Sequence, residues 1–130
     1  MGFGLQARKI LGVGMLLAAV SGQGYAAPGF VIETKVVGTL NDAALFGGCM
    51  ARLSTNLEAQ GMACGADPLV SFDCLGKIGT KSAGTVSFQA AQLAYVTGNK
   101  VNIYVDDTAE KKAALNGFCY SGRIDVLAPG

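Results

Sequence analysis

The sequence has 130 residues, with ten Lys or Arg, nine Asp or Glu and no histidine, so its formal net charge is +1. This balance, without a basic cluster, argues against binding to nucleic acid or an anionic membrane surface, because contacts to phosphate charges supply much of that affinity. Without histidine, the usual general base of acid–base catalysis and of Ser or Cys nucleophiles is also missing.

The N-terminal segment, residues 1–26, is typical of a secretory signal peptide. Arg8 and Lys9 give it a positive start, and an apolar run follows at residues 10–20. Small residues then lead to Ala26, where a signal peptidase would cleave. A core helix or membrane anchor is the alternative, but the run is too short to span a bilayer. We therefore expect a secreted or periplasmic protein with no membrane span in its mature part.

Cleavage after Ala26 would leave residues 27–130 as a single domain of 104 residues (130 minus 26). Arg8 and Lys9 would be lost, so eight basic and nine acidic residues would give this domain a net charge of −1. A domain this small has a limited hydrophobic core, and covalent cross-links would add substantially to its stability.

All four cysteines lie in the expected mature part, and an even number after a signal peptide predicts two disulfides in an oxidising compartment. Zinc is the competing interpretation. The spacings of 15, 10 and 45 residues contain no CxxC pair, and the chain offers no histidine ligand, so zinc is disfavoured. The cysteines are Cys49, Cys64, Cys74 and Cys119.

Three strands are predicted in the first half of the mature chain. Residues 30–40 are rich in β-branched side chains that alternate with polar ones, and weaker patterns follow at 49–54 and 69–74. Between the last two, residues 55–68 form a long loop with three Gly or Pro breaks, and a loop of this length is often functional or pinned in place. The apolar face predicted for the first strand consists of Phe30, Ile32, Val36 and Leu40.

One helix is predicted over residues 85–97, because Ala, Leu and Gln dominate and Gly98 stands where a C-terminal cap belongs. It carries two apolar stripes, whereas a helix with a single core contact needs only one. Either the helix is deeply buried in its own domain, or the side with Phe88 and Tyr95 packs against another subunit. The stripes are Val86, Ala90, Leu93, Ala94 and Phe88, Ala91, Tyr95.

Two more strands are predicted at residues 100–106 and 120–127, joined by a charged segment, 107–116, that forms a loop or a short helix. The order is then β-β-β-α-β-β. A small closed β-barrel with one helix accounts for it, and the five-stranded oligonucleotide/oligosaccharide-binding (OB) barrel has this sequence of elements.

The barrel predicts how the cysteines pair. If the second and third strands form a hairpin, Cys49 at the start of one lies opposite Cys74 at the end of the other. In an OB barrel the fifth strand runs parallel to the third, which brings Cys119 near Cys64. Among the three connectivities we therefore expect Cys49–Cys74 and Cys64–Cys119.

No catalytic, cofactor or metal signature is found in the sequence. The serines have no GxSxG context and no histidine base. Asp106, Asp107 and Glu110 form an acidic cluster, which we interpret as a solvated strand end. A calcium site is the alternative, but the spacing matches no known ligand loop. We expect no enzyme.

Binding remains as the function class. Outward polar and aromatic side chains of the last two strands could hydrogen-bond and stack on a sugar, although they are also what any outward strand face presents. These candidate ligand-binding residues are Asn102, Tyr104, Tyr120, Arg123 and Asp125.

The run at residues 90–104, AAQLAYVTGNKVNIY, resembles the B subunits of AB5 toxins, in particular that of subtilase cytotoxin, in which a helix ends in Thr-Gly before a Val-x-Ile-Tyr strand. The resemblance implies an OB-type barrel, a ring-forming helix with a homo-oligomeric assembly, and a glycan-binding face. The chain also resembles small uncharacterised exported bacterial proteins with a Tyr-Val-Asp-Asp strand and a terminal Arg-Ile-Asp-Val strand, over nearly all of the mature domain.

Two functions follow as hypotheses. The first is an exported binding module that recognises a glycan or another cell-surface ligand. The second is a periplasmic protein–protein interaction or inhibitor module that uses the loop at residues 54–68.

Overall fold

The computed structural model describes residues 29–129, so the expected signal peptide lies outside the described residues. Within them, no helix combines the length and the apolar character needed to cross a bilayer. The strands are β1 (Phe30–Asn41), β2 (Cys49–Leu53), β3 (Leu69–Ser71), β4 (Lys100–Asp106) and β5 (Cys119–Val126). The helices are α2 (Lys81–Thr97) and α3 (Ala109–Ala114), with short 3-10 helices η1 (Phe46–Gly48) and η2 (Glu58–Gln60).

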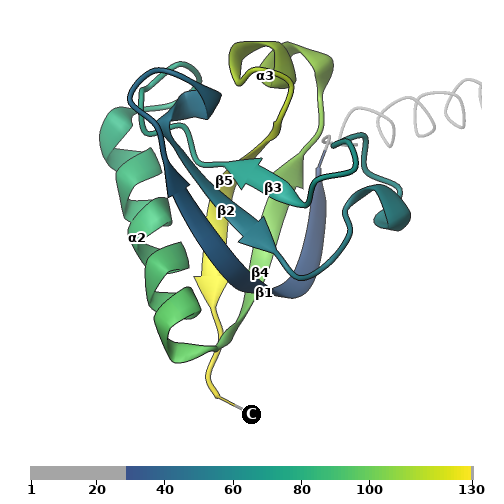
Figure 1. Cartoon of the computed structure of the whole chain (residues 1–130), viewed down its shortest axis with the longest axis vertical. Helices are drawn as coiled ribbons and strands as arrows, with labels where there is room; N and C mark the ends of the chain where they lie inside the picture. Colours follow the sequence, from purple (N-terminus) through teal and green to yellow (C-terminus); the bar gives the residue numbers. More distant parts are fainter. Residues whose placement is uncertain (1–28, 130) are drawn as a thin grey trace, which may run out of the picture.

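The strands close into a barrel in the order β1-β2-β3-β5-β4. Every neighbouring pair is antiparallel except β3 and β5, which run parallel. Figure 1 shows α2 along one side of this barrel, where it packs on β1, β2 and β5, and α3 near one end. The predicted fold class, an OB-type barrel with one main helix and two disulfides, is confirmed.

Both predicted disulfides are present. Cys49–Cys74 joins the start of β2 to the segment after β3, with the Cα atoms 5.7 Å apart. Cys64–Cys119 ties the loop before β3 to the first residue of β5, with the Cα atoms 5.4 Å apart. Since all four cysteines are paired, none is left as a thiolate ligand for zinc.

The core follows the predicted alternation closely in β4, where Val101, Ile103 and Val105 are buried. In β1 the prediction holds only in the middle of the strand. Val36 is buried and Ile32 partly buried, but Phe30 and Leu40 are each 38% exposed. The strand has 12 residues and extends beyond the core at both ends, which a period of two cannot reveal.

Helix α2 begins four residues earlier than predicted. Thr80 caps it, since its hydroxyl oxygen accepts a hydrogen bond from the Ala83 N–H at 3.1 Å. Gly84, which precedes the predicted start of the helix, lies inside it and is buried. The predicted C-terminal cap is confirmed, because Gly98 adopts a φ of 74° and its N–H donates to the Ala94 carbonyl at 2.9 Å.

The inward face of α2 differs from either predicted stripe. Its buried residues are Gly84, Phe88, Ala91 and Ala94, which combines members of both stripes. Val86 and Leu93, expected to lie on one apolar stripe with Ala94, are 64% and 56% exposed. The difference arises because Gly84 lies directly against the backbone of Phe72 and Asp73, and this contact constrains the rotation of the helix about its axis.

Strand β3 ends three residues before the predicted boundary, at a tight turn built on Asp73. This residue has a positive φ of 63°, a conformation that Asp tolerates better than most residues, and it is 1% exposed. Its carboxylate accepts hydrogen bonds from the backbone N–H groups of Lys77, Ile78 and Gly79 at 2.8, 2.6 and 3.0 Å. Asp73 thus organises the whole connection from β3 to α2.

Replacing Asp73 by alanine is expected to lower the free energy of unfolding by about 2 kcal/mol, because three backbone N–H groups in a partly buried turn lose their charged acceptor. Urea denaturation followed by circular dichroism measures the change. Asp42→Ala is the control, since Asp42 also accepts two backbone N–H groups, from Ala44 and Leu45, but at the surface. Equal destabilisation by the two substitutions would contradict this role for Asp73.

The long loop before β3 is firmly attached to the barrel. Leu57 and Met62 are buried in the core, and Cys64 anchors the loop through its disulfide. The backbone at Ala63 is held from both sides, by the Asp107 carboxylate at 2.9 Å and by the Lys112 ammonium at 2.7 Å. The sequence-based expectation of a pinned loop is therefore correct.

Candidate binding groove on β1, β4 and β5

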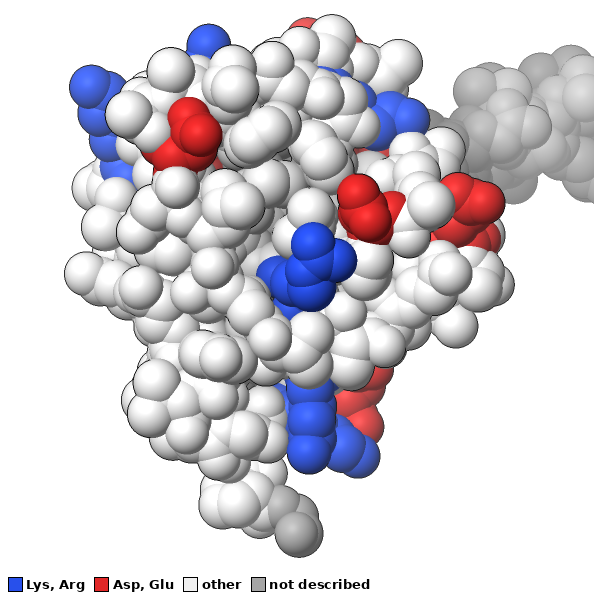
Figure 2. Space-filling view, viewed as in Figure 1, with Lys and Arg blue, Asp and Glu red and all other residues white. Residues whose placement is uncertain are grey.

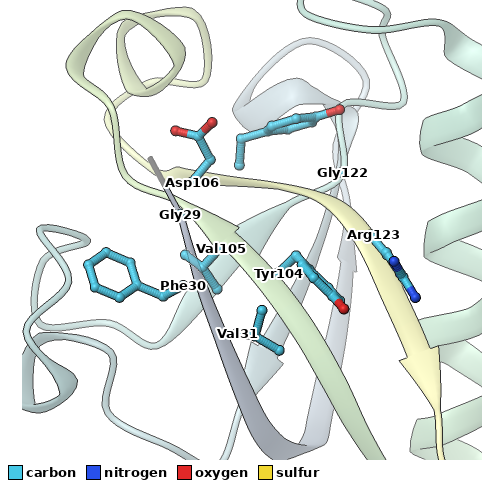
Figure 3. Close-up of a pocket in the computed structure, with 9 residues that line it drawn as sticks. Gly29, Phe30, Val31, Tyr104, Val105, Asp106, Gly122 and Arg123 are labelled. Atoms are coloured by element: carbon cyan, nitrogen blue, oxygen red, sulfur yellow. The ribbon is translucent and has the colours of Figure 1, made fainter. Parts of the chain in front are cut away.

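A groove of about 400 Å³ opens where the start of β1, the end of β4 and the middle of β5 meet (Figure 3). This volume lies in the range of small-molecule sites. Figure 3 shows Asp106 toward one end of the groove and Tyr104 and Val31 toward the other, with Arg123 beside them. The lining residues are Gly29, Phe30, Val31, Tyr104, Val105, Asp106, Tyr120, Gly122 and Arg123.

One wall combines a cation–π contact with an ion pair. Tyr104 on β4 lies directly opposite Arg123 on β5, and the guanidinium carbon is 4.6 Å from the centre of the Tyr104 ring. The same guanidinium donates to both carboxylate oxygens of Asp125, at 3.0 and 3.2 Å. The Asp125 carboxylate raises the pKa of Arg123 above its ordinary value. Tyr104, Arg123 and Asp125 thus form one ordered unit on the outer face of the sheet.

The other end of the groove is formed around Asp106. Its carboxylate accepts hydrogen bonds from the Lys111 ammonium at 2.7 Å and from the Thr108 N–H and hydroxyl at 3.0 and 2.8 Å. Burial raises the pKa of Asp106, but these hydrogen bonds outweigh burial and lower it below its ordinary value. The carboxylate is therefore ionised throughout the physiological pH range and is held in one position.

Tyr120 on β5 faces Asp106 across the β4–β5 ladder. Its ring rests close to Gly122, where an added Cβ would stand 3.2 Å from the Tyr120 hydroxyl oxygen and would crowd the ring. The Lys111 ammonium is 5.4 Å from the centre of the Tyr120 ring. Burial, followed by the negative charge of Asp73, raises the pKa of Tyr120, so its hydroxyl stays neutral and can donate a hydrogen bond.

The structure brings together most of the residues that the sequence suggested. Tyr104, Tyr120 and Arg123 line the groove, and Asp125 adjoins it through the ion pair with Arg123. Asn102 faces Asp125 across the β4–β5 ladder, one step beyond the groove, and does not line it.

The contribution of β1 was not predicted from the sequence. Gly29, Phe30 and Val31 line the groove because β1 pairs with β4, which places Val31 opposite Tyr104. In a closed barrel of this order β1 and β4 are neighbours. The predicted topology was therefore enough to place residues of β1 beside Tyr104. We had assigned Phe30 to the core from its period alone.

The three residues of the predicted acidic cluster lie in different environments and do not form one site. Asp106 lines the groove, and its side chain is only 15% exposed, so interpreting it as a solvated strand end was wrong. Asp107 instead binds the Ala63 N–H, and Glu110 is exposed in the first turn of α3. Within residues 29–129, no three side chains of the metal-binding types are placed to hold a common ion.

A second hollow, of about 530 Å³, lies at the opposite end of β4, near the end of α2 and the C-terminal residues. An ion pair between Lys100 and Glu33, at 3.4 Å and with both side chains more than half exposed, borders it. It has no aromatic wall, which makes it a weaker candidate for recognising an organic ligand.

The two residues suggested for an oligomer interface have different environments. Phe88 is 6% exposed and packs on Phe72 with ring centres 6.4 Å apart, so its side chain belongs to the core of its own domain. Tyr95 is 51% exposed. The exposed apolar side chains of α2 are Val86, Leu93, Tyr95 and Val96.

Charged side chains are scattered over the face seen in Figure 2, where Lys and Arg form small separate groups with Asp and Glu among them. This face therefore presents no continuous basic surface, in agreement with the balanced composition of the chain.

Comparisons with known proteins add no assignment, because no protein-family model, curated protein or solved structure matches this chain significantly.

Proposed function

We propose that the chain is an exported, non-enzymatic binding module whose β1–β4–β5 groove takes a glycan. The observation that carries the proposal is the arrangement of two tyrosines and an Arg–Asp pair around one groove of about 400 Å³. Two disulfides in a small domain support an oxidising, extracytoplasmic location.

The chemistry of a pyranose fits this arrangement. A sugar ring has an apolar C–H face, which aromatic and aliphatic side chains such as Tyr104 and Val31 can cover. Its hydroxyls both donate and accept hydrogen bonds, as the Arg123–Asp125 pair does at the rim. Few polar groups in a largely apolar groove are the usual composition of a small-ligand site.

The proposal predicts that Tyr104→Ala and Arg123→Ala each weaken glycan binding about tenfold or more, because aromatic and Arg anchors dominate binding energy. A glycan array identifies the ligand, and isothermal titration calorimetry with that ligand measures the affinity. Matched controls are Tyr95→Ala on α2 and Arg52→Ala on β2, both exposed residues outside the groove. If no glycan binds, or if all four variants bind alike, the proposal is wrong.

A further inference from the structure

The charged groups around the groove form two closed pairs. Arg123 is held by Asp125 at 3.0 Å, and Lys111 is held by Asp106 at 2.7 Å. Beyond the groove on the same sheet, Lys100 is paired with Glu33 at 3.4 Å. Each cation near the groove therefore already has a carboxylate partner, and the two pairs contribute no net charge.

A further negative charge acts on Tyr120. Asp73 is buried below the β3–α2 turn, where three backbone N–H groups hold its carboxylate, and no cation is among its hydrogen-bond partners. Its field reaches Tyr120, whose pKa it raises after the larger effect of burial. Together with the two closed pairs, Asp73 leaves Tyr120 without an excess of positive charge around it.

This charge arrangement favours ligands with hydroxyls over ligands with anionic groups. In the bidentate pair, Arg123 uses two of its five N–H donors, and the carboxylate oxygens of Asp125 keep free lone pairs. The pair thus offers donors and acceptors side by side, which matches hydroxyls. The carboxylate or sulfate of an anionic sugar can only accept hydrogen bonds. To reach Arg123, this group would have to displace Asp125 or approach the Asp125 carboxylate against like-charge repulsion.

We propose that the groove selects neutral glycans, built from hexoses or N-acetylhexosamines, and rejects sialylated, uronate-containing and sulfated ones. This inference rests on the proposed glycan-binding function and names the class of ligand for the same groove. The specificity arises because, among residues 29–129, no unpaired cation lines the groove.

The test uses an array of matched glycans, each neutral oligosaccharide printed beside its sialylated and sulfated forms. N-acetyllactosamine with its 3′-sialyl and 3′-sulfo derivatives is one such set, and mannotriose and chitotriose extend the neutral part. The bound neutral glycan is expected to exceed its acidic forms by about tenfold or more in affinity. Its binding should change little between about 50 and 500 mM NaCl, since no net charge is neutralised.

A single substitution tests the cause of the selectivity. Asp125→Asn removes the carboxylate but keeps a side chain of the same shape, so Arg123 becomes available to an anion. The ratio of neutral to acidic affinity is expected to fall by about tenfold in this variant. Asp67→Asn, in the exposed loop before β3, is the control and should leave the ratio unchanged.

The outcomes separate this inference from the proposed function. If the wild-type protein binds acidic glycans in preference to their neutral forms, the neutral-glycan inference fails while glycan binding stands. If Asp125→Asn, shown by its melting temperature to be folded, leaves the ratio unchanged, the paired charges are not the cause. If no glycan binds at all, the proposed function itself is wrong and the inference falls with it.

Discussion

Replacing Gly84 by alanine is expected to destabilise the domain by about 3 kcal/mol, although glycine to alanine normally stabilises a helix interior by about 1 kcal/mol. Gly84 lies in α2 against the backbone that follows β3. A Cβ at this position would stand 2.6 Å from the Phe72 carbonyl oxygen and closer still to that of Asp73. Backbone cannot move aside as a side chain can, so α2 would have to shift away from the barrel.

Thermal and urea denaturation of Gly84→Ala measure this loss, and Ser82→Ala, on the exposed side of the same helix, is the matched control. Ser82→Ala should be neutral or slightly stabilising because alanine has the higher helix propensity. If Gly84→Ala were as stable as the wild type, the close contact between α2 and the β3–α2 turn would not exist in solution.

Removing the Cys64–Cys119 disulfide by a double serine substitution is expected to cost about 4 kcal/mol. The bridge spans 55 residues, and on the chain-entropy model a longer closed loop restricts the unfolded chain more. For a domain of this size that is a large part of the total stability. The long loop would also lose its covalent anchor, so limited proteolysis should cut it between residues 55 and 68.

The Cys49–Cys74 double serine variant provides the comparison. This bridge spans 25 residues and should cost about 3.5 kcal/mol by the same model, without exposing the long loop to proteolysis. Urea titrations at equal protein concentration compare the two variants. If the shorter bridge proved the more important for stability or for protection of the loop, the assigned role of Cys64–Cys119 would be contradicted.

The architecture could be predicted because its signals are local and mutually consistent. Alternation in residues 100–106 defined β4, and Gly98 marked the end of α2. Once the order of elements indicated a closed barrel, the parallel placement of β3 and β5 determined which cysteines could meet. The cysteine pairing followed from the topology rather than from the spacing of the cysteines.

The start and orientation of α2 depend on tertiary contacts and could not be predicted in the same way. In sequence, Gly84 is a helix breaker, and only its contact with the backbone of Phe72 and Asp73 explains a glycine within the helix. That contact also decides that Phe88 faces the core while Leu93 faces solvent. Apolar periodicity identifies stripes but does not determine which one is buried.

For the groove, the sequence suggested the residues of β4 and β5 and missed those of β1. Tyr104, Tyr120 and Arg123 were identified because they are outward-facing on adjacent strands. Phe30 lines the groove because β1 extends past the core. How far the strand extends is determined by the closed barrel as a whole and not by the local sequence. Asp106 resembled a solvated strand end because its partner, Lys111, is on a helix that the sequence left undecided.

The position of Tyr120 has a consequence for the kinetics and entropy of the proposed ligand binding. It directly follows Cys119, and both residues lie in the short β3–β5 pairing, where Cys119 faces Val70 and Tyr120 faces Ser71. The groove wall is therefore attached to a covalent cross-link and not to a mobile loop. A preorganised site of this kind loses little conformational freedom on binding, so a ligand would associate with the groove as one rigid surface meeting another.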